Sequence, residues 1–245
     1  MKKKIIIVLT FVFLIFALSP MAFAATRGEI DRASREAYAE IVRRYGPATP
    51  VAPNSQLGQI FRSLTAQSRR RDINYQLSVI DNRTINAMAL PNGQIIVFTG
   101  LLNVLPQNDP NPIAFILAHE IAHVEHRHVE RRSQRNTLTS FALRFLLGNT
   151  NGATRLAGTI VENLLVSGYS RDMEYEADTT ALEIMARAGY DPRGTLTVFN
   201  LFERLERQSS LRVFPTHPRP ADRRQSVVNW LAQRGYHTAG TGLAQ

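Results

Sequence analysis

The amino-acid sequence predicts an α+β fold that is mainly helical, with a small antiparallel or mixed β-sheet surrounded by the helices. Two observations predict it. Between residues 75 and 105, short alternating apolar runs flank the turn residues Asn92-Gly93, which is typical of β-strands, and a helix opens near Gly100. After Asn111-Pro112 the pattern is helical almost to the end, apart from breaks at residues 148–158 and 214–224.

The first 24 residues have the build of a secretory signal peptide. "MKKK" is a basic start, an apolar run of about 14 residues follows, and Ala22-Phe23-Ala24 is a small-x-small cleavage site. We therefore expect the mature chain to begin near Ala25 in a periplasm or outside the cell. An uncleaved membrane anchor is the alternative, although the run is shorter than the ~20 residues that a membrane span needs.

The next segments predict a helix, a link and the start of the main domain. Residues 28–45 are helical in pattern, and the proline-punctuated stretch 46–54 ends that helix. Apolar residues then recur at helical spacing from Leu57 to Leu64. The predicted organisation is a signal peptide (1–24), an N-terminal helix and link (25–54), a main domain (55–235) and a C-terminal tail (236–245).

The composition is that of a globular chain, with 44% hydrophobic and 20% charged residues. It contains no cysteine, so stability must come from the core or a metal rather than from disulfides. Without the leader's Lys2, Lys3 and Lys4 the net charge falls from +9 to 9 − 3 = +6, and a surplus of this size fits loose attraction to anionic lipid heads or acidic polymers. The arginine-rich stretches 69–71 and 127–135 lack interleaved aromatics, so we interpret them as solvated faces and not as a nucleic-acid site.

A histidine stripe runs along the predicted helix from Ile113 to Glu130. At about 100° per residue, His119, His123 and His126 fall within roughly 60° of one another, and aliphatic side chains occupy the opposite side. Such a helix packs one face on a core and presents the other to a cleft.

"HEIAH" lies on this stripe. His119 and His123 are four residues apart, so both imidazoles reach one metal ion, and the adjacent Glu120 can act on a metal-bound water. His126 lies about 10 Å further along a straight helix than His119, so we interpret it as a rim residue. His128 points into the apolar face and is interpreted as a hydrogen-bonded core histidine.

The third ligand must come from elsewhere. A zinc motif with a histidine ten residues after the first fails, because that position is Val129. A carboxylate in "SRDMEYEAD" is the candidate, on a helix expected from about Asp172 to Ala188: Glu174 as ligand, with Asp178 holding the free ring N–H of a ligand histidine. The alternative is that both are solvent-facing charges paired with neighbouring arginines, Arg171 or Arg187.

"HEIAH", then "SRDMEYEAD", then "FPTHPRPADRR" resemble, in this order, the gluzincin metallopeptidases that include CAAX prenyl endopeptidases, HtpX-type heat-shock proteases and soluble periplasmic quality-control proteases. "INAMALPNGQIIVFTGLL" is similar to the strand and turn before that family's active-site helix. The resemblance runs from about Ile85 to Arg224. It implies a zincin-type fold, although the several long apolar spans of the membrane members are missing.

The resemblance also implies roles for individual residues. His217 would lie near the metal, either stabilising an oxyanion or as a fourth ligand that holds the enzyme latent; a loop histidine without a role is the alternative. Arg223 or Arg224 would pair with a carboxylate near the site. The remaining implied roles are zinc ligands His119, His123 and Glu174, general base Glu120 and orienting residue Asp178.

These observations predict a zinc metalloendopeptidase with one zinc per chain that cleaves unfolded or extended polypeptides in protein quality control. Substrate would pair with an exposed edge of "INAMAL" or "NGQIIVF", and Asn86 would bind its backbone, although core strands are an equal alternative. Residues 138–166 are interpreted as packed helices, with a lid or membrane contact as the alternative. A competing hypothesis is an inactive zinc-binding, chaperone-like envelope protein. The oligomeric state is left open.

Overall fold

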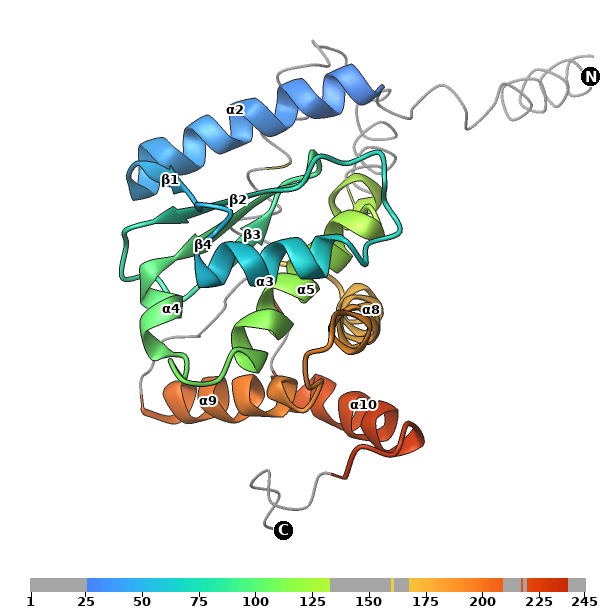
Figure 1. Ribbon diagram of the computed structural model, residues 1–245. Helices are drawn as coiled ribbons and strands as arrows, with labels where there is room; N and C mark the ends of the chain where they lie inside the picture. The colour runs from blue at the N-terminus through green and yellow to red at the C-terminus, as the bar shows by residue number, and fades with distance from the viewer. Residues whose placement is uncertain (1–25, 133–159, 161–167, 209–216, 218–219, 238–245) are drawn as a thin grey trace, which may run out of the picture.

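The computed structural model describes residues 26–132, 160, 168–208, 217 and 220–237 (Figure 1). The predicted signal peptide, most of the segment 138–166 and the end of the predicted tail lie outside the described residues. The domain boundaries therefore stay predictions. Among the residues that the structure describes, no helix is both long enough and apolar enough to cross a membrane.

Helices surround a small mixed sheet, so the predicted α+β class is confirmed. The helices are α2 (Arg27–Tyr45), α3 (Gln56–Thr65), α4 (Thr99–Val104), α5 (Asn111–Glu125), α8 (Arg171–Ala188), α9 (Gly194–Gln208) and α10 (Pro220–Gln233). The strands are β1 (Ala48–Pro50), β2 (Gln76–Ile80), β3 (Ala87–Ala89) and β4 (Gln94–Phe98).

The sheet has the order β1-β2-β4-β3. β2 and β4 are parallel, while β1 is antiparallel to β2 and β3 is antiparallel to β4. β3 and β4 are joined by the predicted Asn92-Gly93 turn, in which Gly93 has a φ of 89°. A Cβ at Gly93 would lie 2.2 Å from the side chain of Ile73, so only glycine fits this turn without rearrangement.

β1 corrects one expectation, because it lies inside the stretch that was predicted to be only a link. Its three residues pair Ala48 with Ile80 and Pro50 with Ser78. A strand ending in proline is accepted here because β1 is an edge strand, where a missing N–H interrupts no further ladder. A stretch this short and proline-rich carries no alternating pattern from which a strand could be read.

Alternate residues of β4 face two different layers. Ile96 and Phe98 pack with residues of α2, such as Ala37 and Ile41, on one face of the sheet. Ile95 and Val97 face the larger core, built with α3 and α5, because successive strand side chains point to opposite faces. Figure 1 shows α2 on one side of the sheet and α3 and α5 on the other.

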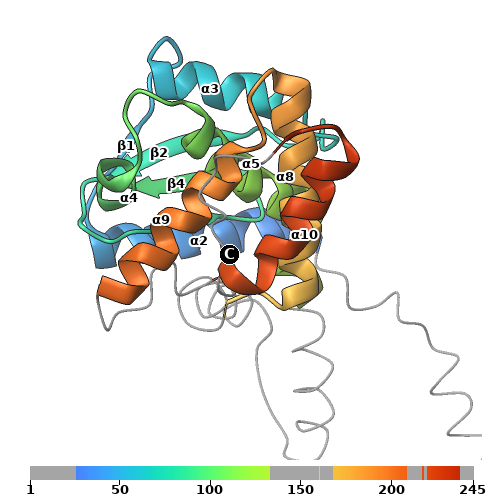
Figure 2. The same cartoon turned by 90° about the horizontal axis from the view of Figure 1, so that it is seen from below.

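The remaining helices pack around α5. α8 and α9 both contact α5, and α10 contacts α8 and α9. Figure 2 shows α10 alongside α8, and Figure 1 shows α9 and α10 on the opposite side of the molecule from α2. α5 is therefore enclosed between the sheet and the C-terminal helices, and its residues from Ala114 to Val124 are buried.

The structure corrects the predicted extent of the histidine-bearing helix. α5 ends at Glu125, His126 and Arg127 form a turn, and helical backbone resumes at His128. Arg127 has a φ of 54°, in the left-handed region that residues other than glycine seldom adopt. His128 therefore does not continue the straight helix from which its direction was predicted.

α8 matches its predicted bounds to within a residue. The hydroxyl of Ser170 accepts a hydrogen bond from the backbone N–H of Met173 and so caps the first turn. Gly189 ends the helix with a φ of 85°, the left-handed conformation common at helix C-termini. This placement turns Glu174 and Asp178 inward, where both are buried.

Candidate metal centre

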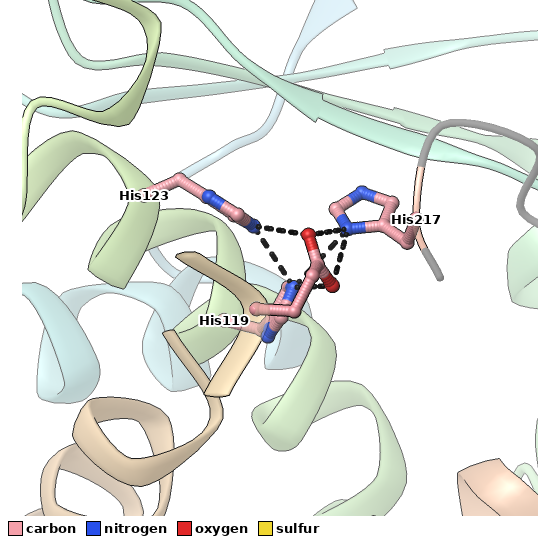
Figure 3. Close-up of side chains that lie close together, drawn as sticks. His119, His123 and His217 are labelled. Carbon is pink, nitrogen blue, oxygen red and sulfur yellow. Dashed lines mark hydrogen bonds and ion pairs between the residues drawn. The ribbon is translucent and has the colours of Figure 1, made fainter. Parts of the chain in front are cut away.

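Two packed helices and one loop residue supply the candidate site. His119, Glu120 and His123 come from α5, and Glu174 comes from the first turn of α8. His217 precedes α10, and its ring points toward those of His119 and His123 (Figure 3). All of these side chains are buried.

The donor atoms converge closely. His119 Nε2 lies 3.0 Å from His123 Nε2 and 3.3 Å from His217 Nδ1. His217 Nδ1 lies 2.9 Å from Glu174 Oε1, which in turn is 3.6 Å from His123 Nε2. One atom from each of the four residues lies within 4.8 Å of all the others.

This set fits a zinc ion. Zinc prefers imidazole nitrogen and carboxylate oxygen at about 2.0–2.2 Å, so the edges of its coordination tetrahedron measure roughly 3.3 Å. The nitrogen spacings of His119, His123 and His217 are close to that value. Two ring nitrogens this close also need a proton or a cation between them, because their lone pairs repel. The residues present are therefore able to hold the metal.

Glu120 is buried next to His217. Its Oε1 is buried and has no hydrogen-bond partner among the described residues, although His217 Nε2 lies 3.7 Å away. An unpaired buried carboxylate oxygen costs free energy unless a ligand or water completes it. Burial raises the pKa of Glu120, which moves this carboxyl toward the range useful for a base at neutral pH.

His119 is held by a buried ion pair. Asp178 Oδ1 lies 3.0 Å from His119 Nδ1, so the ring donates there and turns Nε2 toward the other donors. Arg223 makes a two-pronged contact with Asp178, and its Nη1 lies 2.9 Å from Glu174 Oε2. One guanidinium thus links the candidate ligand Glu174 to the residue that orients His119.

The charges in this cluster shift the pKa values of its members in opposite directions. Burial by itself lowers the pKa of His119, but hydrogen bonds to Asp178 and Glu174 outweigh it and raise that pKa to about 9. Burial by itself raises the pKa of Asp178 and of Glu174. At Asp178 the charge of Arg223 outweighs burial only together with hydrogen bonds to His119 and Arg223. At Glu174 the charges of His217 and Arg223 act together with hydrogen bonds to His119 and His217, so the pKa values of both carboxyls end below their usual range.

His123 is oriented by different groups. Its Nδ1 lies 2.8 Å from Nδ1 of His128, and the ring of Tyr169 stacks on it with centroids 3.9 Å apart. Burial, followed by the charge of His119, places the pKa of His123 well below 6.5. His126, by contrast, contacts Thr180 and Glu176 and lies outside the four-residue cluster.

Sequence reasoning missed Tyr169 and mistook the surroundings of His128. Tyr169 stands just before α8 in a stretch without periodicity, so no pattern indicated its contact with His123. His128 is buried and hydrogen-bonded as predicted, but its partners are His123 and Glu176 and not the apolar core. The turn at Arg127 redirects it, and neither glycine nor proline there signals a break.

The other predicted residues are placed as follows. Asn86 immediately precedes β3 and is buried, and its Oδ1 has no hydrogen-bond partner within the described part of the chain. Arg224 pairs with Glu203 on α9, so Arg223 is the arginine that reaches the site. The pairing predicted for Arg223 or Arg224 is therefore made by Arg223, whereas the substrate contact of Asn86 stays a prediction.

A helix bearing "HEIAH", a glutamate from a second helix and a small mixed sheet define the zincin-type class of metallopeptidases. The chain belongs to peptidase family M48, whose sequence profile matches residues 52–231. Since members of this family are metallopeptidases, a metal cofactor, typically zinc, is part of what membership implies.

Several characterised relatives are similar over much of this chain. Mitochondrial metalloendopeptidase OMA1 of Schizosaccharomyces pombe is 28% identical over 207 residues, which is 82% of this chain and 61% of that protein. The Arabidopsis thaliana OMA1 is 34% identical over 153 residues, which is 62% of this chain and 31% of that protein. Metalloprotease LoiP of Escherichia coli is 27% identical over 225 residues, which is 87% of this chain and 85% of that protein. The chain thus spans about a third to three fifths of these mitochondrial relatives.

Proposed function

We propose that this protein is a zinc-dependent metalloendopeptidase that cleaves unfolded or extended polypeptides. One observation carries the proposal: four buried metal-binding side chains converge beside Glu120, whose Oε1 has no partner among the described residues. A site that only holds metal needs no such carboxylate. Relatives named metalloendopeptidases and metalloproteases support the same activity.

In this proposal His119, His123 and Glu174 hold one zinc ion per chain. Bound zinc would supply Lewis-acid activation of the scissile carbonyl and of water. Glu120 takes a proton from the attacking water and delivers it to the leaving amine as the C–N bond breaks. Asp178 and Arg223 keep His119 in the tautomer whose Nε2 faces the donor cluster.

His217 has two candidate roles, and its position favours one. Its Nδ1 is among the converging donor atoms, 2.9 Å from Glu174, which favours a fourth ligand that holds the site closed. A donor to the oxyanion would instead be free to meet substrate. His217→Ala separates them: casein cleavage rises if His217 holds the site closed, and kcat falls about 100-fold or more if it stabilises the transition state.

The substrate proposal rests on the sheet. β3 has a strand partner on one side only among the described strands, and it packs near α5, so its other edge is the place where an extended peptide would pair. Asn86, next to this strand, would bind the peptide backbone through the buried Oδ1 that lacks a partner in the described residues. β3 itself is buried, so this pairing requires its edge to be uncovered first.

We also propose that the protein works in the cell envelope, in protein quality control. The support is the composition of residues 1–24, with a basic start, an apolar run and a small-x-small site. The assignment to a soluble, exported subgroup near the CAAX prenyl endopeptidases or HtpX-type proteases is likewise a proposal. A cleaved leader would leave a mature N-terminus near Ala25, which N-terminal sequencing of the exported protein tests.

The test of the activity compares wild type with Glu120→Gln on casein. The amide keeps the size of the side chain but cannot take a proton, so cleavage should fall by at least 1,000-fold, on the order of general-base and electrostatic losses. Zinc content should stay unchanged. If both proteins bind zinc and neither cleaves any unfolded substrate, the competing hypothesis of an inactive zinc-binding, chaperone-like protein takes over.

A further inference from the structure

A series of hydrogen bonds runs from His123 through His128 to Glu176, away from the candidate metal centre. His123 Nδ1 lies 2.8 Å from His128 Nδ1, and His128 Nε2 lies 3.0 Å from Glu176 Oε2. Glu176 is paired with Arg131, whose Nη1 is 2.6 Å away. His128 is fully buried, while Glu176 and Arg131 are partly exposed.

The direction of the protons in this series follows from the chemistry of its ends. His123 binds a metal through Nε2 only if its proton sits on Nδ1, so Nδ1 must donate to His128. His128 Nδ1 then accepts, and its own proton sits on Nε2. Glu176 is a carboxylate that accepts this proton's hydrogen bond, so every donor in the series meets an acceptor.

The backbone is shaped to make this contact. On a straight helix, residues five positions apart differ by about 140° in direction and about 7.5 Å along the axis, too far for their rings to meet. Here α5 stops at Glu125, and the left-handed Arg127 turns the chain before helical backbone resumes at His128. His128 Nδ1 is brought to within hydrogen-bond distance of His123 by that turn.

We propose that His128 is a positioning residue for the zinc ligand His123, fixing its tautomer and ring direction through a hydrogen bond that continues to Glu176. The inference rests on the proposed zinc site. It gives the two helix-borne histidines equivalent support: His119 donates to Asp178, which pairs with Arg223, and His123 acts through His128 on Glu176, which pairs with Arg131. Hydrogen bonds that metal-bound imidazoles donate toward carboxylates tighten metal binding in this way.

A second metal site is the competing explanation for the same side chains. His126, His128 and Glu176 each offer an atom within 4.8 Å of the others. A metal on His128 Nε2, however, would place the proton on Nδ1, facing the Nδ1 proton that His123 needs as a ligand. Arg131 also occupies one oxygen of Glu176. The geometry therefore favours the positioning role.

The experiment measures zinc affinity by competition with a chromophoric chelator. His128→Phe keeps a ring but removes both nitrogens, and we expect zinc affinity to fall about 10- to 100-fold. His128→Gln offers a carbonyl to His123 and an amide N–H to Glu176, so affinity should return to within about threefold of wild type. His126→Asn is the control: His126 stacks on His128 and contacts Glu176 but lies outside the path from His123 to Glu176, so affinity should stay within about threefold of wild type.

The outcomes separate the inference from the proposed function. If wild type binds no zinc, the proposed function fails. If wild type binds zinc and His128→Phe binds it equally well, only the positioning role is overturned. Two zinc ions in wild type, one of them lost in His126→Asn, would overturn it in favour of a second metal site. Should the Phe variant not fold, Glu176→Ala decides: a loss of about threefold or more supports the series, and unchanged affinity overturns it.

Discussion

At the scale of single residues, the site depends on buried charges that neutralise one another. Arg223 contacts both Asp178 and Glu174, and all three are buried. Asp178 is thereby free to fix His119, while Glu174 stays ionised as a ligand. A buried carboxylate that loses its cation is expensive, so the arginine is required before any metal arrives.

Arg223→Ala should therefore destabilise the zinc-free protein by about 3–5 kcal/mol, since two buried carboxylates lose their cation. Chemical denaturation of metal-free protein measures this. Arg224→Ala is the control, because Arg224 pairs with Glu203 at a partly exposed position and should cost about 1 kcal/mol or less. If both variants lose the same free energy of unfolding, Arg223 contributes no more to stability than Arg224 does.

The raised pKa of His119 makes zinc binding depend on pH. With a pKa of about 9, His119 is protonated in the zinc-free protein at neutral pH, and zinc must displace that proton. Apparent affinity should then rise by about tenfold per pH unit between pH 6.5 and 8.5 and level off above 9. Asp178→Asn removes the main group that raises this pKa, so its slope should be shallower. Identical slopes would exclude Asp178 as the cause.

At the scale of elements, the sequence predicted α8 and missed the end of α5 for physical reasons. Ser170 caps α8 and Gly189 ends it, and the four-residue spacing of Glu174 and Asp178 predicted that both lie on one face of this helix. The end of α5 carries no such signal, because Arg127 takes a left-handed conformation without being glycine. A helical wheel that assumes a straight helix through His128 therefore predicted the wrong neighbours for this residue.

Gly194 at the start of α9 tests how tightly the helices around the site are packed. A Cβ there would lie 2.6–2.8 Å from Asn111, largely from its backbone, where α9 meets the start of α5. Gly194→Ala should cost about 1–3 kcal/mol of unfolding free energy through overpacking. Gly28→Ala in α2 meets nothing within 4 Å and should be neutral or slightly stabilising. A neutral Gly194→Ala would mean that this helix junction tolerates displacement.

At the scale of the molecule, the candidate ligands join parts of the chain that are distant in sequence. His119 and His123 on α5, Glu174 on α8 and His217 before α10 meet beside the sheet. The way these elements come together cannot be read from a pattern within any one of them. The sheet order, the short β1 and the approach of Tyr169 to His123 all depend on tertiary packing. The motifs nevertheless identified His119, His123 and Glu174, because their spacing and chemistry are local, and the family resemblance added His217.

Because the chain has no cysteine, zinc would be a cross-link between these elements that disulfides cannot supply. A ligand bound only by the folded state stabilises it by about 2.7 kcal/mol at 100 times its Kd. Removing zinc with a chelator should lower the Tm by several degrees, and adding zinc back should restore it. If the Tm does not change when zinc is removed, zinc does not stabilise the folded state.

The most direct test of the central claim is the zinc content of the purified protein beside Glu174→Gln. The account predicts about one zinc per chain in wild type, and a zinc affinity reduced at least 100-fold in the variant, which keeps its fold but loses the charged ligand. Casein cleavage should disappear with the zinc. Wild-type protein that holds no zinc when prepared without chelators, or a Glu174→Gln variant that binds zinc as tightly as wild type, would contradict it.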